Sequence, residues 1–208
     1  MSSNQPALLI PAAPARTEIR VVNSRFIASA GPSASVEAGR AFIAGIRAEL
    51  PDASHHVYAY IVGHGATTTL GMSDDGEPSG TAGRPVMAVL RGSGLGDVVL
   101  VVTRYFGGTL LGTGGLVHAY GDAAKAVLAL LPRAEKIERR ELTISIAYGV
   151  FDQTRRLIAA HAGAVVDEAF AAEVTLRVLI PQAQIEPFTA ALGAATAGQA
   201  RVSVEREA

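Results

Sequence analysis

The amino-acid sequence predicts an α+β fold divided between two domains. The first observation is the almost continuously apolar run at residues 97–106, which indicates a central strand covered on both faces. The second is a helical pattern that begins near Gly115 and keeps apolar residues on one face over roughly 17 positions. The third is the order strand, helix, strand, strand, helix, strand after residue 137, which is the ferredoxin-like pattern βαββαβ.

The first domain is expected to begin with a hairpin and a helix. Residues 18–30 are rich in alternating β-forming residues around a short polar turn, as in a β-hairpin. Ser35 is suited to cap a helix that carries Glu37 in its first turn and ends before Pro51.

A strand is expected over residues 55–63, and an unusually long polar loop follows at residues 66–83. Loops of this length are uncommon in a compact domain unless they serve a function. A helix then starts between Thr81 and Pro85, because proline in the first turn lacks only an N–H group that the helix does not use.

The two ends of the first domain have the composition of connecting segments. Residues 1–15 are rich in Pro and Ala and predict a flexible lead-in, and residues 132–136 predict a linker. This places the first domain at residues 16–136 and the second at residues 137–208. In the second domain we expect strands at 141–148, 164–170, 173–180 and 199–205, and helices at 151–161 and 182–195.

Composition excludes several classes of function. The chain has no cysteine, which excludes disulfides, thiol nucleophiles, thiolate zinc sites and iron–sulfur ligation. Its apolar runs are shorter than the roughly 20 residues that a membrane span needs, and its start does not resemble a signal peptide. We therefore expect a cytoplasmic protein with no membrane association.

The charge balance does not favour bulk binding of nucleic acid. The net charge is −1. Residues 1–136 carry 11 Lys and Arg against 10 Asp and Glu, and residues 137–208 carry 7 against 9. Because proteins that bind phosphate backbones usually have a basic surplus, any RNA contact would need a local patch.

The most informative part of the long loop is SDDGEPSGTAGRP, residues 73–85. It places three carboxylates within four residues, which suggests either a site for a hard cation or paired carboxylates for acid–base chemistry. The spacing differs from that of an EF-hand loop, and no nucleophile accompanies it. A third interpretation is a solvated turn that caps the next helix through Ser79 or Thr81.

The second informative segment is TRYFGGTLLGTGGL, residues 103–116. A glycine-rich turn between a buried strand and a helix presents free backbone N–H groups, which suit an anion. The glycine spacing fits neither a Walker loop nor a dinucleotide-binding turn. The glycines could equally serve the close packing of the strand on the helix.

The histidines do not form an obvious metal site. His55 and His56 are adjacent on a predicted strand, so their side chains point to opposite faces and cannot easily share one ion. His64 could approach either from the loop, although a strand histidine is more often simply hydrogen-bonded. We expect neither a metal nor a cofactor.

Together, SDDGEPSGTAGRP and VVTRYFGGTLLGTGGLVHAY resemble the signature of the IMPACT/YigZ family in its bacterial two-domain form. Two shorter matches support this: Ser24-Arg25-Phe26 in the hairpin and Ala53-Ser54-His55 before the following strand. The resemblance covers roughly residues 16–206. It implies a ribosomal protein S5 domain 2-like fold for the N-terminal domain and a ferredoxin-like fold for the C-terminal domain, both related to domains of the translocating elongation factor.

The resemblance also implies a role in translation. Eukaryotic members of the family compete for the activator of a kinase that phosphorylates an initiation factor. We therefore expect a binding protein that regulates translation through a protein or ribosomal partner. Direct RNA binding through Arg104, Tyr105 and the glycine turn is one alternative. An enzyme for a small phosphorylated or peptide-like ligand is another, and a pocket joining His55, Glu77 and Arg104 would favour it.

The two segments supply the candidate binding residues. We expect them to form one surface, with an acidic part at Asp74, Asp75 and Glu77. Replacing Asp74 and Asp75 by Ala is then expected to change stability by less than about 1 kcal/mol. His118 stands where the family has Arg, which leaves Arg84 and Arg104 as the better candidates for contact with an anion. The full set is His55, Ser73, Asp74, Asp75, Glu77, Ser79, Thr81, Arg84, Arg104, Tyr105, Gly107, Gly108, Gly112, Gly114, Gly115 and His118.

Overall fold

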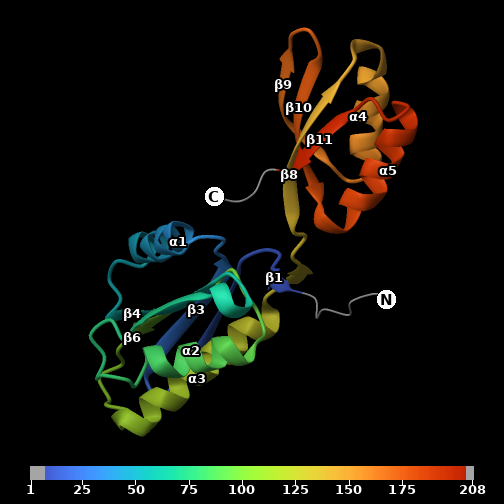
Figure 1. The fold of residues 1–208 in the computed structure, drawn as a ribbon. Coiled ribbons are helices and arrows are strands. Elements are labelled where there is room, and N and C mark those ends of the chain that lie inside the picture. The colour runs from blue at the N-terminus through green and yellow to red at the C-terminus, as the bar shows by residue number, and fades with distance from the viewer. Residues whose placement is uncertain (1–7, 205–208) are drawn as a thin grey trace. The chain divides into compact units, whose positions relative to one another are not determined.

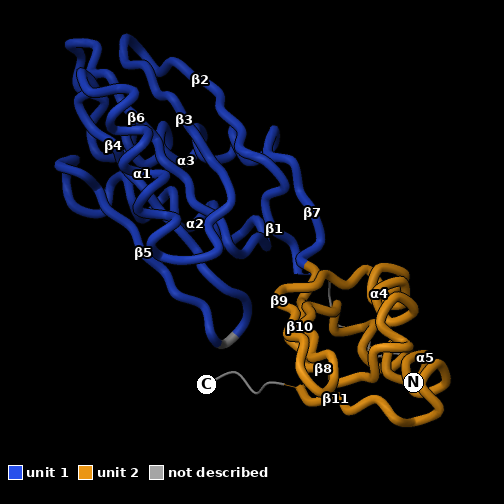
Figure 2. Tube along the Cα trace, turned by 90° about the horizontal axis from the view of Figure 1, so that it is seen from above, with its two compact units in different colours: residues 1–136 blue, residues 137–208 orange. Residues whose placement is uncertain are grey.

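A computed structural model of the chain describes residues 8–204, which divide into two compact units. Unit 1 comprises residues 1–136 and unit 2 comprises residues 137–208 (Figure 2). In the described part of the chain, no helix combines the length and the apolar character needed to cross a membrane.

Unit 1 is built on a five-stranded antiparallel sheet with the strand order β2-β3-β6-β4-β5. Helices α2 and α3 cover one face of the sheet, and α1 lies on the other (Figure 1). This α+β arrangement agrees with the predicted fold class. The strands are β2 (Ala15–Val21), β3 (Ser24–Pro32), β4 (His55–Val62), β5 (Thr69–Ser73) and β6 (Val98–Tyr105), and the helices are α1 (Val36–Glu49), α2 (Gly83–Gly92) and α3 (Gly112–Leu130).

Strand β6 is the centre of the sheet, as its apolar sequence predicts. Val98, Leu100 and Val102 pack into the core beneath α2 and α3, while Val99 and Val101 pack toward α1. The strand is buried on both faces up to Arg104. The Arg104 side chain therefore lies at the edge of the hydrophobic core.

The long loop after β4 contains structure that the sequence pattern does not reveal. After a short 3₁₀ turn at Gly65–Thr67, Thr69–Ser73 forms the edge strand β5 and pairs with β4. Its apolar residues Leu70 and Met72 remain 39% and 47% exposed at the edge of the sheet. Edge strands with few buried side chains lack the alternating pattern on which sequence prediction depends.

The expected lead-in and linker also differ from the structure. Residues 1–7 lie outside the described residues, but Leu9–Pro11 forms strand β1. It pairs antiparallel with β7 (Arg133–Glu135), which occupies most of the expected linker. The backbone N–H of Gly96 also bonds to Leu9 O at 3.0 Å. This pairing joins segments more than a hundred residues apart, so local composition does not indicate it.

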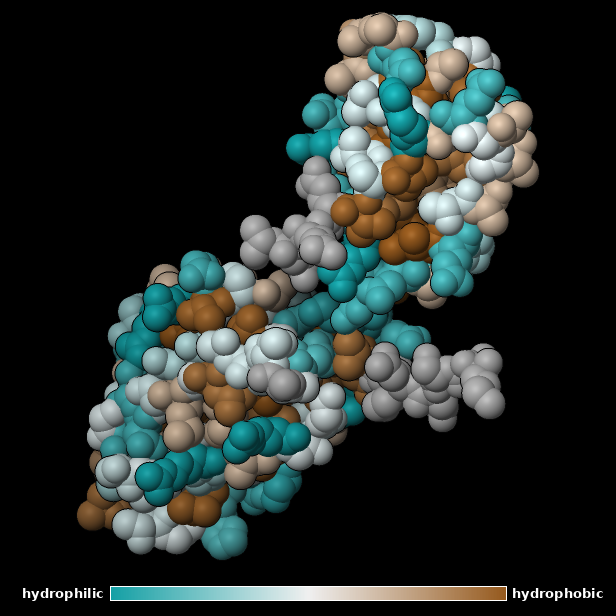
Figure 3. Space-filling view, viewed as in Figure 1, coloured by the Kyte–Doolittle hydropathy of each residue, from teal (hydrophilic) through white to brown (hydrophobic). Residues whose placement is uncertain are grey.

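Unit 2 has the predicted order βαββαβ. Its four-stranded antiparallel sheet has the order β11-β8-β10-β9, and its helices pack on one core with the sheet. The edge strand β11 leaves Val202 and Val204 37% and 54% exposed, and Figure 3 shows apolar residues at the surface of this unit. The elements are β8 (Arg139–Ile146), a 3₁₀ turn (Tyr148–Val150), α4 (Phe151–Ala160), β9 (Ala164–Phe170), β10 (Val174–Pro181), a 3₁₀ turn (Gln182–Gln184), α5 (Ile185–Ala195) and β11 (Arg201–Val204).

Candidate functional site

The Asp74 side chain accepts hydrogen bonds from the backbone at the start of α2. Its Oδ1 accepts hydrogen bonds from the backbone N–H groups of Ala82 and Gly83 at 3.1 and 2.8 Å, and its Oδ2 accepts one from Gly80 at 2.8 Å. Burial alone would raise the pKa of this carboxyl, but the three N–H donors outweigh burial and lower its pKa below the ordinary value. The side chain therefore acts as a remote helix cap.

This capping by Asp74 corrects the expectation that Ser79 or Thr81 caps the helix. The residue at the cap position is Ala82, which has no capping side chain. Thr81 instead donates its hydroxyl hydrogen to Pro78 O at 2.6 Å within the loop, and Ser79 is exposed. Local sequence patterns detect only caps that are close along the chain, and Asp74 lies nine residues before Gly83.

Asp75 faces away from Asp74 and ties the loop to strand β4. It accepts a hydrogen bond from the backbone N–H of His56 at 2.6 Å, forms an ion pair with Arg47 of α1, and its own N–H bonds to Ser73 Oγ at 3.1 Å. Asp75 has a positive φ of 47°, a conformation that Asp tolerates better than most residues. Although burial raises the pKa of Asp75, its hydrogen bonds lower it overall.

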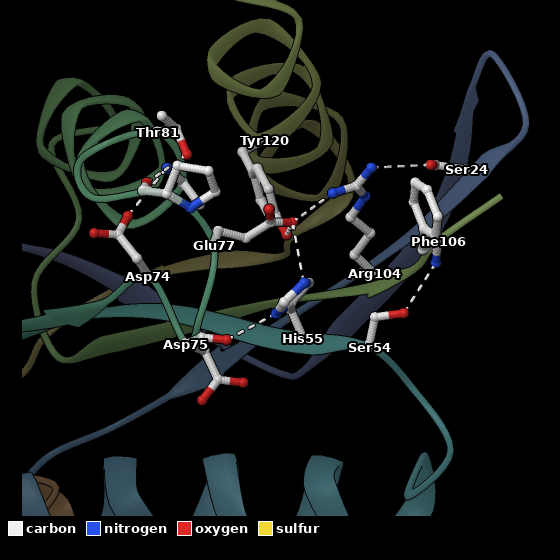
Figure 4. A network of polar contacts seen from close by, with 12 residues as sticks. Ser24, Ser54, His55, Asp74, Asp75, Glu77, Thr81, Arg104, Phe106 and Tyr120 are labelled. Atoms are coloured by element: carbon white, nitrogen blue, oxygen red, sulfur yellow. Dashed lines mark hydrogen bonds and ion pairs between the residues drawn. The ribbon is translucent and has the colours of Figure 1, made fainter. Parts of the chain in front are cut away.

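Glu77, in the same loop, has a buried side chain. One of its carboxylate oxygens has three polar neighbours (Figure 4). Its Oε1 accepts hydrogen bonds from Arg104 Nη1 and from the Tyr120 hydroxyl, both at 2.7 Å, and lies 3.8 Å from His55 Nε2. Burial and the bond to Glu77 raise the pKa of Tyr120, so its hydroxyl remains a donor. Glu77 thus links β4, β6 and α3.

Arg104 is enclosed by aromatic rings and by hydrogen-bond acceptors. Its guanidinium carbon lies 5.5 Å from the ring centre of Phe26 and 5.4 Å from that of Phe106, and Nη2 donates to Ser24 Oγ at 3.2 Å. Its side chain is only 5% exposed. An arginine fixed in this way contributes its charge to the interior of the site and not to an open surface.

Each of the three carboxylates of the loop therefore contacts different elements of unit 1. Asp74 bonds to the start of α2, Asp75 to β4 and α1, and Glu77 to β6 and α3. The expectation that they form the acidic part of one exposed surface is wrong on this geometry. Within residues 8–204, no three His, Asp or Glu side chains are grouped so that they could hold a metal ion.

The glycines of the second segment divide into two kinds. A Cβ at Gly107 would lie 2.0 Å from Asn23 O, so this position requires the close approach of two backbones. Gly108, in the turn before α3, and Gly112, the first residue of α3, have positive φ values of 81° and 69°. Gly114 has open space around it.

The start of α3 carries no side-chain cap. Leu111 occupies the cap position and makes no capping hydrogen bond. The first-turn N–H groups at Gly112, Thr113 and Gly114 therefore have no side-chain acceptor within the described residues. Gly115 lies one position further on, with Leu111 Cβ at 3.1 Å from where its own Cβ would be. Such N–H groups favour an acceptor or an anion.

A pocket of about 380 Å³ opens between the two signature segments. His55, Glu77 and Arg104 form its polar part, so the three residues expected to indicate a ligand site do lie on one pocket. Most of its wall is apolar. The lining residues are His55, Glu77, Pro78, Arg104, Phe106, Leu110, Leu111, Gly112, Thr113 and Leu116.

The remaining candidates lie outside this pocket. The Tyr105 hydroxyl donates to Asp52 at 2.9 Å, and Arg25 stacks over its ring at 4.3 Å. Arg84 and His118 are exposed and do not line it. Sequence reasoning missed Phe106, Leu110, Leu111, Leu116 and Tyr120, and the one available signal was an apolar Leu-Leu pair within a glycine-rich turn.

Comparison with known proteins gives matches to both units. Residues 22–128 match the family described as the Impact N-terminal domain, and residues 144–199 match a domain of unknown function (DUF1949). IMPACT family member YigZ of Escherichia coli K12 is 43% identical over 185 residues, which are 88% of this chain and 91% of that protein. An IMPACT family member of Haemophilus influenzae is 38% identical over 192 residues, or 92% and 93% of the two chains.

A solved structure also matches nearly the whole chain. It is described as the crystal structure of a hypothetical protein and is 40% identical in sequence. The match has a TM-score of 0.80 and covers 97% of this chain and 98% of the other. The architecture of both units is therefore shared with an experimentally determined relative.

Proposed function

This chain belongs to the IMPACT family, and we propose that it is a binding protein that regulates translation through a protein or ribosomal partner. The role in translation rests on the family resemblance of the two signature segments. The inference that the partner is a protein rests on one observation, the apolar rim of the pocket between the two signature segments. Leu110 is 86% exposed and Phe106 is 47% exposed beside that pocket.

Exposed apolar side chains beside a preformed pocket suit a protein partner. A few side chains that become buried in well-packed pockets supply most of the affinity in protein interfaces. The charges in the pocket are already paired, because Arg104 is bonded to Glu77 and both are nearly inaccessible. A partner therefore gains binding free energy by burying the apolar rim, and it does not need to neutralise a charge.

Direct RNA binding, the first alternative, has less support from the geometry. The mechanism expected for it used Arg104, Tyr105 and the glycine turn. Arg104 is 5% exposed, and Tyr105 bonds to Asp52 and stacks with Arg25. Phosphate contacts need free cationic groups, and affinity gained from them falls steeply with salt.

The second alternative, an enzyme acting on a small phosphorylated or peptide-like ligand, is favoured by one observation. His55, Glu77 and Arg104 line a single pocket. His55 Nδ1 lies 2.8 Å from Asp75 O and donates its hydrogen to that carbonyl, while Nε2 lies 3.8 Å from Glu77 Oε1. A histidine base requires such an orienting bond on Nδ1, but the only hydroxyl among the lining residues is that of Thr113, and no hydrogen bond joins it to His55 in the described part of the chain.

A pull-down with the tagged full chain tests the proposal. It is run from cytosol at low and high salt and scored for proteins and RNA together. The test variant is Phe106→Ala/Leu110→Ala, and the matched control is Leu70→Ala/Met72→Ala, which removes two exposed apolar side chains from β5. We expect a salt-resistant protein or ribosomal partner whose recovery falls at least about tenfold in the test variant only.

Other outcomes count against the proposal. Equal recovery with both double variants would show that the pocket rim does not carry binding. RNA that is captured at low salt and lost at high salt, with no protein requirement, would favour the RNA-binding alternative.

A further inference from the structure

We propose that the pocket binds a single apolar residue of an extended peptide segment in the partner. In this arrangement the apolar side chain packs against Leu111 and Leu116. The backbone N–H of the bound residue donates to Glu77 Oε2, and its backbone C=O accepts a hydrogen bond from the first turn of α3. This inference rests on the proposed function, because it specifies what the same pocket recognises.

The unused oxygen of Glu77 identifies the donor that a ligand must bring. All three polar partners of this carboxylate contact Oε1, and no described residue contacts Oε2. Glu77 lines the pocket although its side chain is 97% buried, being only 3% exposed. Oε2 is not among the fully buried side-chain atoms that lack a partner, so it stays accessible, and one N–H group from a ligand in the pocket would replace water as its donor.

The start of α3 identifies the acceptor. Gly112 and Thr113 line the same pocket, and the first turn of this 19-residue helix has no side-chain cap. Its N–H groups carry a partial positive charge and favour a carbonyl or carboxylate oxygen. The pocket therefore offers one acceptor and a set of donors, which is the complement of a single peptide unit.

The remaining wall selects the side chain. Phe106, Leu110, Leu111 and Leu116 contribute apolar surface to the pocket. Its volume of about 380 Å³ is at the small end of the roughly 300–1,000 Å³ range of ligand pockets, which suits one residue with its flanking amides.

A phosphorylated ligand fits this chemistry less well. The only cationic side chain with a fixed charge among the lining residues is Arg104, and its Nη1 and Nη2 already donate to Glu77 and Ser24. An incoming phosphate would also meet the free carboxylate oxygen of Glu77. The neutral balance of the pocket therefore favours a peptide group over an anion.

The test uses N-acetyl-leucine methylamide, which reproduces one peptide residue, as the probe. Binding to the full chain is followed by two-dimensional ¹H–¹⁵N NMR. We expect saturable shifts at Gly112, Thr113 and neighbouring amides. The matched ligand, in which the leucine nitrogen is methylated, lacks the N–H donor and is expected to bind at least about tenfold more weakly.

Two variants test the acceptor side of the pocket. Thr113→Pro removes one N–H in the first turn of α3, where the helix itself does not use it, and Thr113→Ala keeps that N–H. We expect binding by Thr113→Pro to be at least about fivefold weaker than binding by Thr113→Ala, because the two variants both lack the threonine side chain and differ in the N–H group. The methylated ligand is tested on the wild-type protein, so it does not depend on any variant. The inference can therefore still be refuted if Thr113→Pro fails to fold.

Three results would overturn the inference. These are no binding of the probe up to its solubility limit, equal binding of the methylated ligand, or shifts of the same amides by inorganic phosphate at lower concentration than by the probe. If the pull-down still depends on Phe106 and Leu110 in any of these cases, the proposed function stands and only the peptide-residue inference fails.

Discussion

Arg104 Nη1 lies 2.7 Å from Glu77 Oε1, and the two side chains are 5% and 3% exposed. This buried ion pair joins the two signature segments, since Glu77 belongs to the loop before α2 and Arg104 to the end of β6 (Figure 4). The segments are thus parts of one buried network that also forms the floor of the pocket. Glu77 and Arg104 thus belong to the two signature segments, and their ion pair also connects the elements that form the site.

Removing one partner of this pair is expected to be strongly destabilising. Arg104→Met should lower the free energy of unfolding by about 3–5 kcal/mol, because it leaves Glu77 buried without its main counter-charge. Urea denaturation measures the change. The control is Arg201→Met, whose exposed ion pair with Glu173 should contribute less than about 1 kcal/mol. Similar small losses in both variants would mean that the buried pair is not structurally important.

Replacement of Asp74 is expected to destabilise α2. Asp74→Ala leaves three backbone N–H groups without their acceptor and should lower the free energy of unfolding by about 1–2 kcal/mol. This revises the expectation, drawn from the sequence, that replacing Asp74 and Asp75 changes stability by less than about 1 kcal/mol. Asp74→Asn keeps one acceptor oxygen and should lie between wild type and Asp74→Ala in urea denaturation.

The contribution of Asp74 should also depend on pH. Its pKa in the folded protein lies below its ordinary value, so its contribution is fully present above the unfolded pKa of about 3.9. It is lost as the pH falls through the folded pKa, because protonation removes the charged acceptor. The difference in stability between wild type and Asp74→Asn should therefore shrink as the pH falls from about 4 through the folded pKa. A constant difference over that interval would contradict this account.

The parts of the fold that sequence reasoning predicts best are those with strong local patterns. The apolar run of β6 and the order βαββαβ of unit 2 both appear as predicted. The predicted helix near Gly115 is also present, although it starts earlier, at Gly112. Each of these features is encoded within about twenty consecutive residues, where periodicity is sufficient evidence.

The features that sequence reasoning misses all depend on residues far apart in the chain. Strand β1 exists because β7 pairs with it, and the cap of α2 comes from Asp74 across a loop. In the site, His55, Glu77 and Arg104 meet as expected, but their burial and the apolar wall around them follow from how α3 packs on β6. Spacing along the sequence carries no information about that packing.

The glycines of the second segment should respond differently to substitution. Gly107→Ala would place a Cβ 2.0 Å from Asn23 O, so the turn has to shift and stability should fall by about 1–3 kcal/mol. Gly114→Ala meets open space inside a helix and should be neutral or stabilise by up to about 1 kcal/mol. Thermal unfolding compares the two, and equal effects would contradict the assignment of Gly107 to close backbone packing.

Lys136 is expected to anchor the end of unit 1 through Asp97. Its Nζ lies 2.6 Å from Asp97 Oδ2, while Asp97 Oδ1 accepts a hydrogen bond from Gly63 N–H at 2.7 Å. Burial raises the pKa of Asp97, but the bond from Lys136 and the bond from Gly63 lower it overall. Lys136→Met removes the larger of these two favourable contributions, so the pKa of Asp97 should rise.

This change has a measurable consequence for acid stability. In wild type the contribution of Asp97 is present above its unfolded pKa and is lost only as the pH falls through the lowered folded pKa. In Lys136→Met the contribution should be smaller and its loss should be complete at a higher pH, and the free energy of unfolding at pH 7 should fall by about 1–3 kcal/mol because Asp97 stays buried. NMR titration of the Asp97 carboxyl measures the first effect and urea denaturation the second. An Asp97 pKa that does not rise in the variant would show that Gly63 alone stabilises the charged carboxylate.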